Sequence, residues 1–237
     1  MKKNLTLLLF VFGLVTMVKA QDTETRSVGT FDEMKVSHGI EVVLVDGNGG
    51  EITLYGRNTD LEDIYTEVER GTLRIKFRNS RIWNWDNHRF NNRNIRVEVP
   101  FEGLYNIEVN TGAIVSSKSI IQGEDLRLEV TTGGEADLEI KVKRFVAEIA
   151  MGAVVEVSGR VETFRVKANM GSEGDFRNLE SDYVYAKSNM GAELQVKALK
   201  EIDASAGMGG MIFVYGSPEK RYTSHGFGGE INFERIN

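Results

Sequence analysis

Glycine recurs in the second half of the chain at steps of 18 to 21 residues, and this period constrains the fold more than any other feature. The register comprises Gly112, Gly133, Gly152, Gly171, Gly191, Gly209 and Gly228. Apolar residues predominate three and five positions before and after these glycines, whereas the positions between them are largely polar. Alternation with a period of two is typical of a strand with one buried face. Each unit is therefore predicted to be strand, glycine corner, strand and short turn.

Repeats of about 19 residues made only of strands favour a parallel β-helix, or β-solenoid, in which coils stack at about 4.8 Å. Stacking like on like explains why equivalent positions hold equivalent residues. An antiparallel meander is the alternative, because the short turns would also suit hairpins. A single coil buries too little apolar surface to offset the entropy of ordering its backbone. We therefore expect the coils to form one continuous array.

Methionine precedes four of these glycines, as Met151, Met170, Met190 and Met208. Glycine adopts the positive φ of a bend without steric cost. The methionines share the parity of the buried positions, so we expect their flexible side chains to fill the inside of the corner. Stacked thioethers would alternatively bind Cu(I), but no His or Cys reinforces them. The sequence favours packing and predicts no metal site and no cofactor.

The N-terminus has the pattern of a secretory signal peptide. Lys2 and Lys3 form a basic start, an apolar stretch follows over residues 5–18, and Val18-Lys19-Ala20 supplies small residues before a cleavage point. The apolar stretch is too short to favour a spanning helix. We therefore predict export to the periplasm, the cell surface or the extracellular medium, with residues 1–20 removed and 21–237 forming a single domain.

Composition excludes several partners. Loss of Lys2, Lys3 and Lys19 with the signal peptide removes three positive charges and moves the formal charge from −6 to −9. An acidic surface argues against nucleic acid and against docking on anionic lipid. No second apolar run reaches spanning length, so no membrane insertion is expected after cleavage. The chain has no Cys, which rules out disulfides and a Cys nucleophile.

The N-terminal part, residues 21–104, is less regular than the coils of 105–237. Phe31–Val45 matches one further unit centred on Gly39. Strands are predicted over 51–55, 64–68, 72–77 and 95–99, with 64–77 forming a hairpin through Glu69-Arg70-Gly71 and a helical turn within 58–63. Such a region suits the cap that the terminal repeats of a solenoid need.

Three segments together are similar to a known family: FDEMKVSHGIEVVL, LEDIYTEVERGTLRIKF and LYNIEVNTGAIV. They resemble the head GIN domain family of exported bacterial proteins, common in Bacteroidetes and described as autotransporter adhesins. The similarity covers roughly residues 28–236. It implies a right-handed parallel β-helix with an irregular N-terminal portion, and it supplies no catalytic residues.

Two columns of carboxylates are the candidates for catalysis. One lies two positions after the register glycines (Glu135, Glu173, Glu193, Glu230) and the other four positions after (Asp137, Glu156, Asp175). Glycosidase chemistry needs two carboxyls in different environments, one of them kept protonated by burial. These face outward by parity, so a solvated surface is favoured and no catalytic residue is assigned. The three histidines, His38, His88 and His225, are too scattered to suggest a zinc site.

The best candidate binding region is RNSRIWNWDNHRFNNRN, residues 78–94. It holds both tryptophans of the chain, Trp83 and Trp85, together with Arg81 and Arg89. Aromatic faces beside Arg and Asn can stack on sugar rings and bind their hydroxyls. The alternative is a strand that covers an open end of the solenoid, and the sequence favours this cap. The four residues are still the predicted ligand-binding set.

These observations favour a non-enzymatic cell-envelope or secreted protein that acts as an adhesin or surface-interaction module, with a glycan or another envelope protein as its partner. A carbohydrate-active enzyme on the same scaffold is one alternative. A purely structural or oligomerising periplasmic module, self-associating through sheet edges or end coils, is the other.

Overall fold

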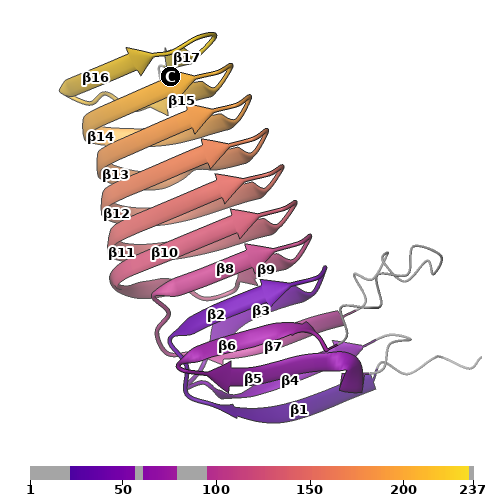
Figure 1. Ribbon diagram of the computed structural model, residues 1–237. Helices are drawn as coiled ribbons and strands as arrows, with labels where there is room; N and C mark the ends of the chain where they lie inside the picture. Colours follow the sequence, from indigo (N-terminus) through magenta and orange to yellow (C-terminus); the bar gives the residue numbers. More distant parts are fainter. Residues whose placement is uncertain (1–21, 57–60, 79–94, 235–237) are drawn as a thin grey trace, which may run out of the picture.

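The computed structural model describes residues 22–56, 61–78 and 95–234, and it is a stack of β-coils (Figure 1). Parallel pairing of successive units confirms the β-solenoid of about 19 residues per turn and excludes the meander. The regular coils are built from β8 (Asn106–Asn110), β9 (Ile114–Ser117), β10 (Ile121–Thr131), β11 (Glu135–Ala150), β12 (Val154–Asn169), β13 (Glu173–Asn189), β14 (Glu193–Gly207), β15 (Met211–Tyr215), β16 (Lys220–His225) and β17 (Glu230–Glu234).

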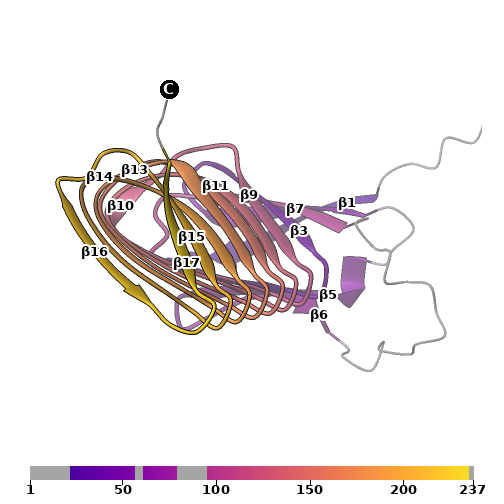
Figure 2. The ribbon, with the colours of Figure 1, turned by 90° about the horizontal axis from the view of Figure 1, so that it is seen from above.

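Each long strand, β11 to β14, runs from one glycine turn around the far side of the coil to the next turn. Seen from above, the coils superpose as flattened rings (Figure 2). The register between β11 and β12 extends from Glu135↔Val154 to Ala150↔Asn169. A shift interrupts the register of β12 with β13 between Glu156 and Gly159. Equivalent sequence positions therefore lie one strand spacing apart along the axis.

The predicted apolar positions form the interior of the solenoid. Leu128, Ala147 and Val166 of one row are all buried, as are Leu138 and Val157 of another. Two expectations are wrong. Tyr105 lies seven positions before Gly112 and shares the parity of the buried residues, but it is exposed, because it precedes the start of β8. In the last coil, Phe233 and the whole of β16 are exposed, because no described strand pairs with their outer edge.

Three phenylalanines fill the middle of the core. The ring centroids of Phe145 and Phe164 lie 5.2 Å apart with parallel planes, and those of Phe164 and Phe176 lie 4.7 Å apart. Phe176 occupies the space beside Gly174, where a Cβ would come within 2.6 Å of the ring and 2.9 Å of Ile149 and Leu194. The missing side chain at residue 174 thus makes room for the ring two residues later.

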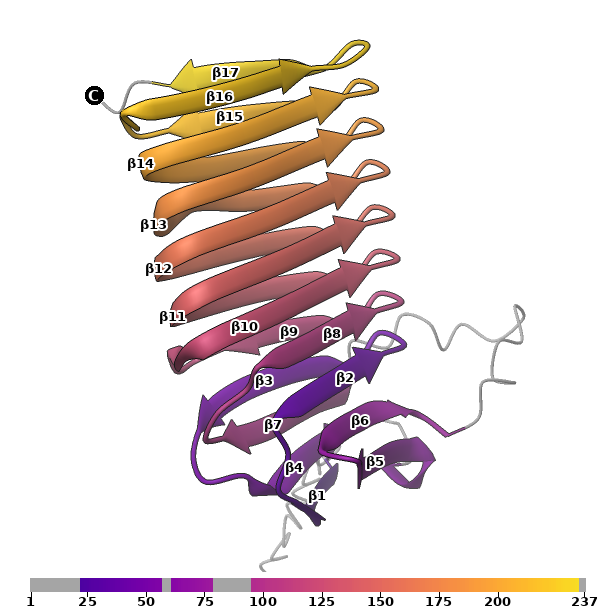
Figure 3. The same ribbon diagram turned by 60° about the vertical axis from the view of Figure 1, so that its left-hand side comes forward.

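The placement of the methionines inside the corner is wrong. Met151, Met170, Met190 and Met208 are 47–56% exposed and form a column at the edge of the stack where the turns protrude (Figure 3). Each has a φ of 49–56° and is followed by a glycine with positive φ. Two such residues in succession define a type I′ turn. The left-handed backbone ends the strand alternation and directs the side chain outward, so parity no longer predicts burial.

The N-terminal part forms the lower end of the stack. Its elements are β1 (Asp22–Gly29), β2 (Glu33–Ser37), β3 (Glu41–Asp46), β4 (Gly50–Gly56), the 3₁₀ turn η1 (Leu61–Asp63), β5 (Ile64–Glu69), β6 (Thr72–Phe77) and β7 (Ile95–Phe101). The strands β2 and β3 flank Gly39 and pair in parallel with β8 and β9, which confirms the further coil predicted there. The β5–β6 hairpin is also confirmed.

Antiparallel strands close this lower end. The pair β1–β4 and the pair β4–β7 run antiparallel, whereas β2 and β3 pair in parallel with β6 and β7 beneath them. The predicted helical turn is η1, and residues 58–60 of its expected range lie outside the described residues. Across the described ranges, no helix has the length and hydrophobicity to cross a membrane.

A charged cluster joins three coils at the side opposite the turns. Asp182 of β13 accepts hydrogen bonds from Arg160 of β12 at 2.5 Å and Lys200 of β14 at 2.9 Å, and its side chain is only 11% exposed. The hydrogen bond from Lys200 is the main reason that the pKa of Asp182 is lowered; burial opposes it, and the charges of Arg160 and Lys200 assist. The carboxylate therefore stays ionised and links neighbouring coils.

Replacing Gly174 with Val should lower the free energy of unfolding by about 1–3 kcal/mol, because the added methyls overpack the core against Phe176. Urea denaturation followed by circular dichroism measures this. The matched control is Glu173→Val, at the neighbouring outward position, which should change stability by no more than about 0.5 kcal/mol. Equal effects of the two substitutions would contradict the packing described here.

Replacing Asp182 with Asn should lower the free energy of unfolding at pH 7 by about 1–3 kcal/mol, because charged hydrogen bonds to Arg160 and Lys200 are lost. The folded pKa of Asp182 is depressed, so its contribution is present above the unfolded pKa of about 3.9 and disappears as the pH falls through the folded value. The difference between the two proteins should shrink below about pH 4. The free energy of unfolding is measured as a function of pH, and Asp137→Asn, which replaces an exposed carboxylate, is the control.

Candidate functional site

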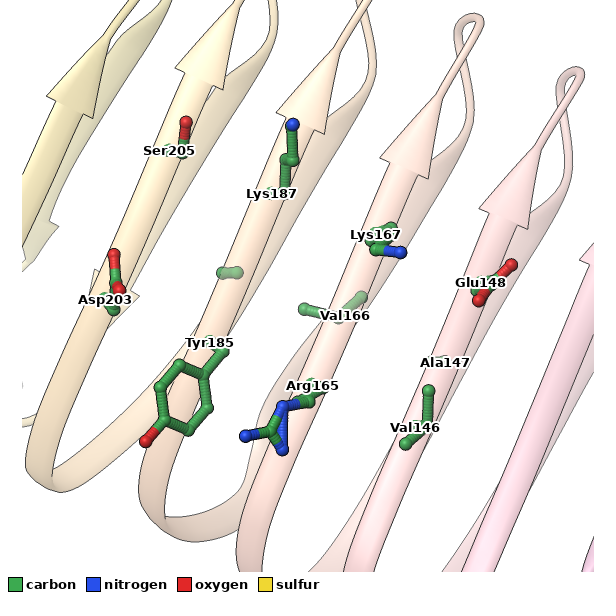
Figure 4. A pocket seen from close by; sticks show the side chains of 11 residues that line it. Val146, Ala147, Glu148, Arg165, Val166, Lys167, Tyr185, Lys187, Asp203 and Ser205 are labelled. Atoms are coloured by element: carbon green, nitrogen blue, oxygen red, sulfur yellow. The ribbon is translucent and has the colours of Figure 1, made fainter.

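A shallow groove of about 310 Å³ lies on the outer face of the sheet formed by β11, β12, β13 and β14. Figure 4 shows how successive strands contribute to it. Outward side chains at two equivalent positions of each repeat line the groove: Val146, Glu148, Arg165, Lys167, Tyr185, Lys187, Asp203 and Ser205. Because the coils are in register, these eight side chains form two parallel rows that run along the solenoid axis.

The centre of the groove carries unpaired positive charge. Lys167 and Lys187 are direct register partners on β12 and β13, so they lie one strand spacing apart, about 4.8 Å. Glu148, the next residue of that row, is paired with Arg127 at 3.2 Å. Within the described ranges, neither lysine lies within ion-pair distance of a carboxylate. Like charges placed directly opposite are unfavourable, and on an acidic protein this arrangement is suited to receiving an anion.

An aromatic ring and a guanidinium form one wall. The Arg165 guanidinium lies 4.5 Å from the centroid of the Tyr185 ring, within the range of a cation–π interaction. Tyr185 is half-buried, so part of its side chain is accessible from the groove. Asp203 and Ser205 follow on β14 and add hydrogen-bonding groups beside the ring. The groove thus combines cations, an aromatic ring, the Ser205 hydroxyl and two carboxylates, Glu148 and Asp203, over four coils.

The acidic columns lie near the start of β11–β14 and β17, away from the groove residues, and face outward as predicted. Glu173 and Glu193 are register partners and lie at the surface. Burial of Asp175 would raise its pKa, but hydrogen bonds from the side chain and backbone of Arg177, with the guanidinium charge, lower the pKa overall. The carboxylate is held ionised by a contact of 2.5 Å to Arg177 Nη2. It is therefore unsuited to donate a proton.

The predicted ligand-binding residues Trp83, Trp85, Arg81 and Arg89 all lie outside the described residues, so their role in binding stays a prediction. His88 lies there too. His38 is the first residue of the turn of the β2–β3 coil, with a φ of 68°. Its pKa is lowered by burial and then by the charge of Lys76. Among the described residues, no three His, Cys, Asp or Glu side chains form a group that could hold a metal ion.

The groove was missed from the sequence, although its signal was present. Lys167 and Lys187 both stand four positions before a register glycine, and Arg165 and Tyr185 both stand six before. Stacking the repeats brings each pair together. Alternating polar residues were interpreted as a solvated face, because sequence alone does not say which charged side chains find partners in neighbouring coils.

Solved structures with similar folds support the architecture. A protein described as a "putative adhesin" from Bacteroides fragilis NCTC 9343 matches with a TM-score of 0.80 and 17% identity, over 92% of this chain and 98% of that one. A "putative adhesin" from Parabacteroides merdae ATCC 43184 matches with a TM-score of 0.68 and 12% identity, over 93% of this chain and 98% of that one. A "putative lipid binding protein" from Parabacteroides distasonis ATCC 8503 matches with a TM-score of 0.65 and 16% identity, over 93% of this chain and 98% of that one. These similarities establish the shared fold.

Among curated proteins, none matches the chain. A family profile described as "Putative auto-transporter adhesin, head GIN domain" matches residues 30–218. The match includes the coil around Gly39, the β5–β6 hairpin and the regular coils through β15, so it spans both the irregular and the repetitive parts. The chain therefore belongs to the head GIN domain family, as its sequence motifs had indicated.

Proposed function

We propose that this chain is a non-enzymatic, exported surface-interaction protein that binds an extended acidic polysaccharide along the groove of β11–β14. The observation that carries the proposal is the pair Lys167 and Lys187, which are adjacent, exposed and without carboxylate partners among the described residues. The adhesin description of the family is in keeping with a binding role. The export signal expected over residues 1–20 would bring the protein into contact with envelope or extracellular polymers.

The repeat geometry suits a polymeric ligand. Rows of equivalent side chains extend along the solenoid axis at one residue per coil, so a long chain with regularly spaced groups could lie across several coils at once. Uronic acid carboxylates would meet Lys167 and Lys187, while the Tyr185 ring would contact the apolar face of a sugar. Several weak contacts along one polymer reinforce each other, which is how a shallow site gains affinity.

The lysines can be tested by affinity electrophoresis and titration calorimetry with polygalacturonate as the acidic polymer and dextran as the neutral one. Lys167→Gln/Lys187→Gln should weaken polygalacturonate binding at least about tenfold, because two charge-assisted contacts are lost. Binding by the wild type should weaken with added salt. Lys118→Gln/Lys141→Gln, which removes the same charge elsewhere, should bind nearly as the wild type does.

Equal binding of dextran, or equal losses in both double variants, would contradict the proposal. Trp83→Ala/Trp85→Ala addresses the loop predicted from the sequence: selective loss of binding in this variant would place the ligand there instead of in the groove. Tyr185→Ala, compared with Tyr185→Phe, isolates the contribution of the ring, since only the former removes it.

A structural, oligomerising role is the second candidate, and the open last coil favours it. All residues of β16 are exposed, and Phe227 in the following turn is 93% exposed. Within the described chain, β16 pairs only with β14 and β17 only with β15, which leaves one edge of each strand without a partner. Unpaired strand edges favour association with another chain.

This second candidate predicts a dimer joined through the last coil. Light scattering after size-exclusion chromatography should show about twice the monomer mass. Tyr222→Lys/Phe227→Lys should shift it to a monomer, because charged side chains on an edge oppose pairing. Tyr105→Lys/Ile120→Lys, which adds two charges on exposed residues near the start of the regular coils, is the control. A monomeric wild type at all concentrations would exclude this role.

A further inference from the structure

The methionine column is not explained by the backbone conformation of its turns. The turn around Met190 is closed by a hydrogen bond from Ala192 N–H to the Asn189 carbonyl at 3.2 Å, and Met190 and Gly191 both have positive φ. The first position of such a turn favours Asn, Asp or Gly, because other side chains are strained in the left-handed region. Met occupies it four times in succession. Thr111 and Thr132 hold the same position with positive φ in the two preceding turns, so only the repeated choice of Met points to a functional position.

Backbone hydrogen bonds fix the spacing of the four side chains. Gly152 N–H donates to the Met170 carbonyl at 3.1 Å, Gly171 N–H to Met190 at 3.0 Å, and Gly191 N–H to Met208 at 3.2 Å. Consecutive turns are thus tied together in register, and the methionines project from equivalent points at one strand spacing, about 4.8 Å. The turns protrude at one edge of the stack, where the column is open to solvent (Figure 3).

The side chain of Met151 reaches along this column toward the preceding turn. The sulfur of Met151 lies 4.0 Å from the hydroxyl of Thr132, which occupies the equivalent position of the preceding turn. If neighbouring sulfurs keep the coil spacing of about 4.8 Å, a point midway between them lies about 2.4 Å from each. That value is close to the distance of about 2.3 Å between zinc and a cysteine sulfur in proteins. Methionine has enough rotatable bonds to adjust the remaining distance.

These thioethers are concentrated in one place. The chain has no Cys and eight Met, of which four are in the column. Met34 is fully buried in β2, and Met211 is the first residue of β15, directly after the turn that holds Met208. Thioethers are uncharged soft donors that select Cu(I) over hard cations such as Ca²⁺ and Mg²⁺. The sequence disfavoured a metal because no His or Cys reinforces the methionines, and it placed their side chains inside the corner as packing. The structure corrects the placement, since all four side chains are exposed.

We propose that Met151, Met170, Met190 and Met208 form a binding site for a soft monovalent metal ion of the Cu(I) class, coordinated by the sulfurs of adjacent turns. The site is independent of the groove on β11–β14. Binding needs neighbouring methionines, since sulfurs one turn apart can share an ion whereas sulfurs three turns apart cannot.

The site can be tested on the purified chain by anaerobic titration with Cu(I), using bicinchoninate as the competing chromophoric ligand. The wild type should withdraw Cu(I) from bicinchoninate. Met170→Leu/Met190→Leu leaves two thioethers three turns apart, and its affinity should fall at least about tenfold, the lower range of losses seen when even an outer-shell partner is removed. Met151→Leu leaves three consecutive thioethers and should keep most of the affinity.

Met34→Leu is the matched control, because it removes a thioether that is fully buried in β2, outside the column, and should leave Cu(I) affinity unchanged. X-ray absorption of the Cu(I) complex should show sulfur neighbours near 2.3 Å, and thermal unfolding should confirm that each variant is folded. The proposal is overturned if the wild type fails to compete with bicinchoninate, if Met170→Leu/Met190→Leu binds Cu(I) as the wild type does, or if nitrogen and oxygen alone surround the metal. Polysaccharide binding is measured separately and does not depend on this outcome.

Discussion

The hydrogen bonding between successive coils is the constraint on which the rest of the structure depends. The registers of β11 with β12 and of β13 with β14 place equivalent residues directly above one another. The same ladder continues through the turns, where each glycine N–H donates to a carbonyl of the next coil. Because the backbone fixes this spacing, any residue type repeated in the sequence becomes a row of identical side chains in space.

Inside the solenoid, these rows form a core that depends on compensation between coils. The Phe145, Phe164 and Phe176 rings stack, and Gly174 provides the space that the last of them needs. A side chain that is too large in one coil can be accommodated only by a smaller neighbour in the same or the next one. The repeat therefore limits the combined volume of the side chains along each row, whereas the residue type at any one position can differ between coils.

Outside the solenoid, the same rows create the candidate sites. Some outward charges find partners in neighbouring coils, as Asp182 does with Arg160 and Lys200. Lys167 and Lys187 have no ion pair within the described chain, and together with Tyr185 they give the groove its chemical character. The turns present a different kind of row, in which thioethers replace charges. Two faces of one regular scaffold thus differ because a few residues per repeat differ.

Much of the fold could be predicted from the sequence, because burial along a strand follows period-two alternation and coil length follows the glycine spacing. The further coil around Gly39 and the hairpin of β5 and β6 were predicted in the same way. The methionine positions were predicted wrongly, since alternation fails where the backbone turns left-handed at Met170 and its equivalents. The groove was not predicted, because pairing between charges depends on which coils become neighbours.

By itself, the sequence determined that the chain is a stack of strand-built coils with an apolar interior, since that pattern is local and repeats in every unit. Only the tertiary structure decided that the β2–β3 coil sits between β6–β7 and β8–β9, although residues 47–105 separate it from the latter in the chain. It also decided which lysines remain unpaired and that the methionines face solvent. The order of the coils and the unpaired lysines depend on contacts between residues about twenty or more positions apart, which no local pattern encodes. The methionines face solvent because the backbone becomes left-handed at each turn, which the apolar alternation does not reveal.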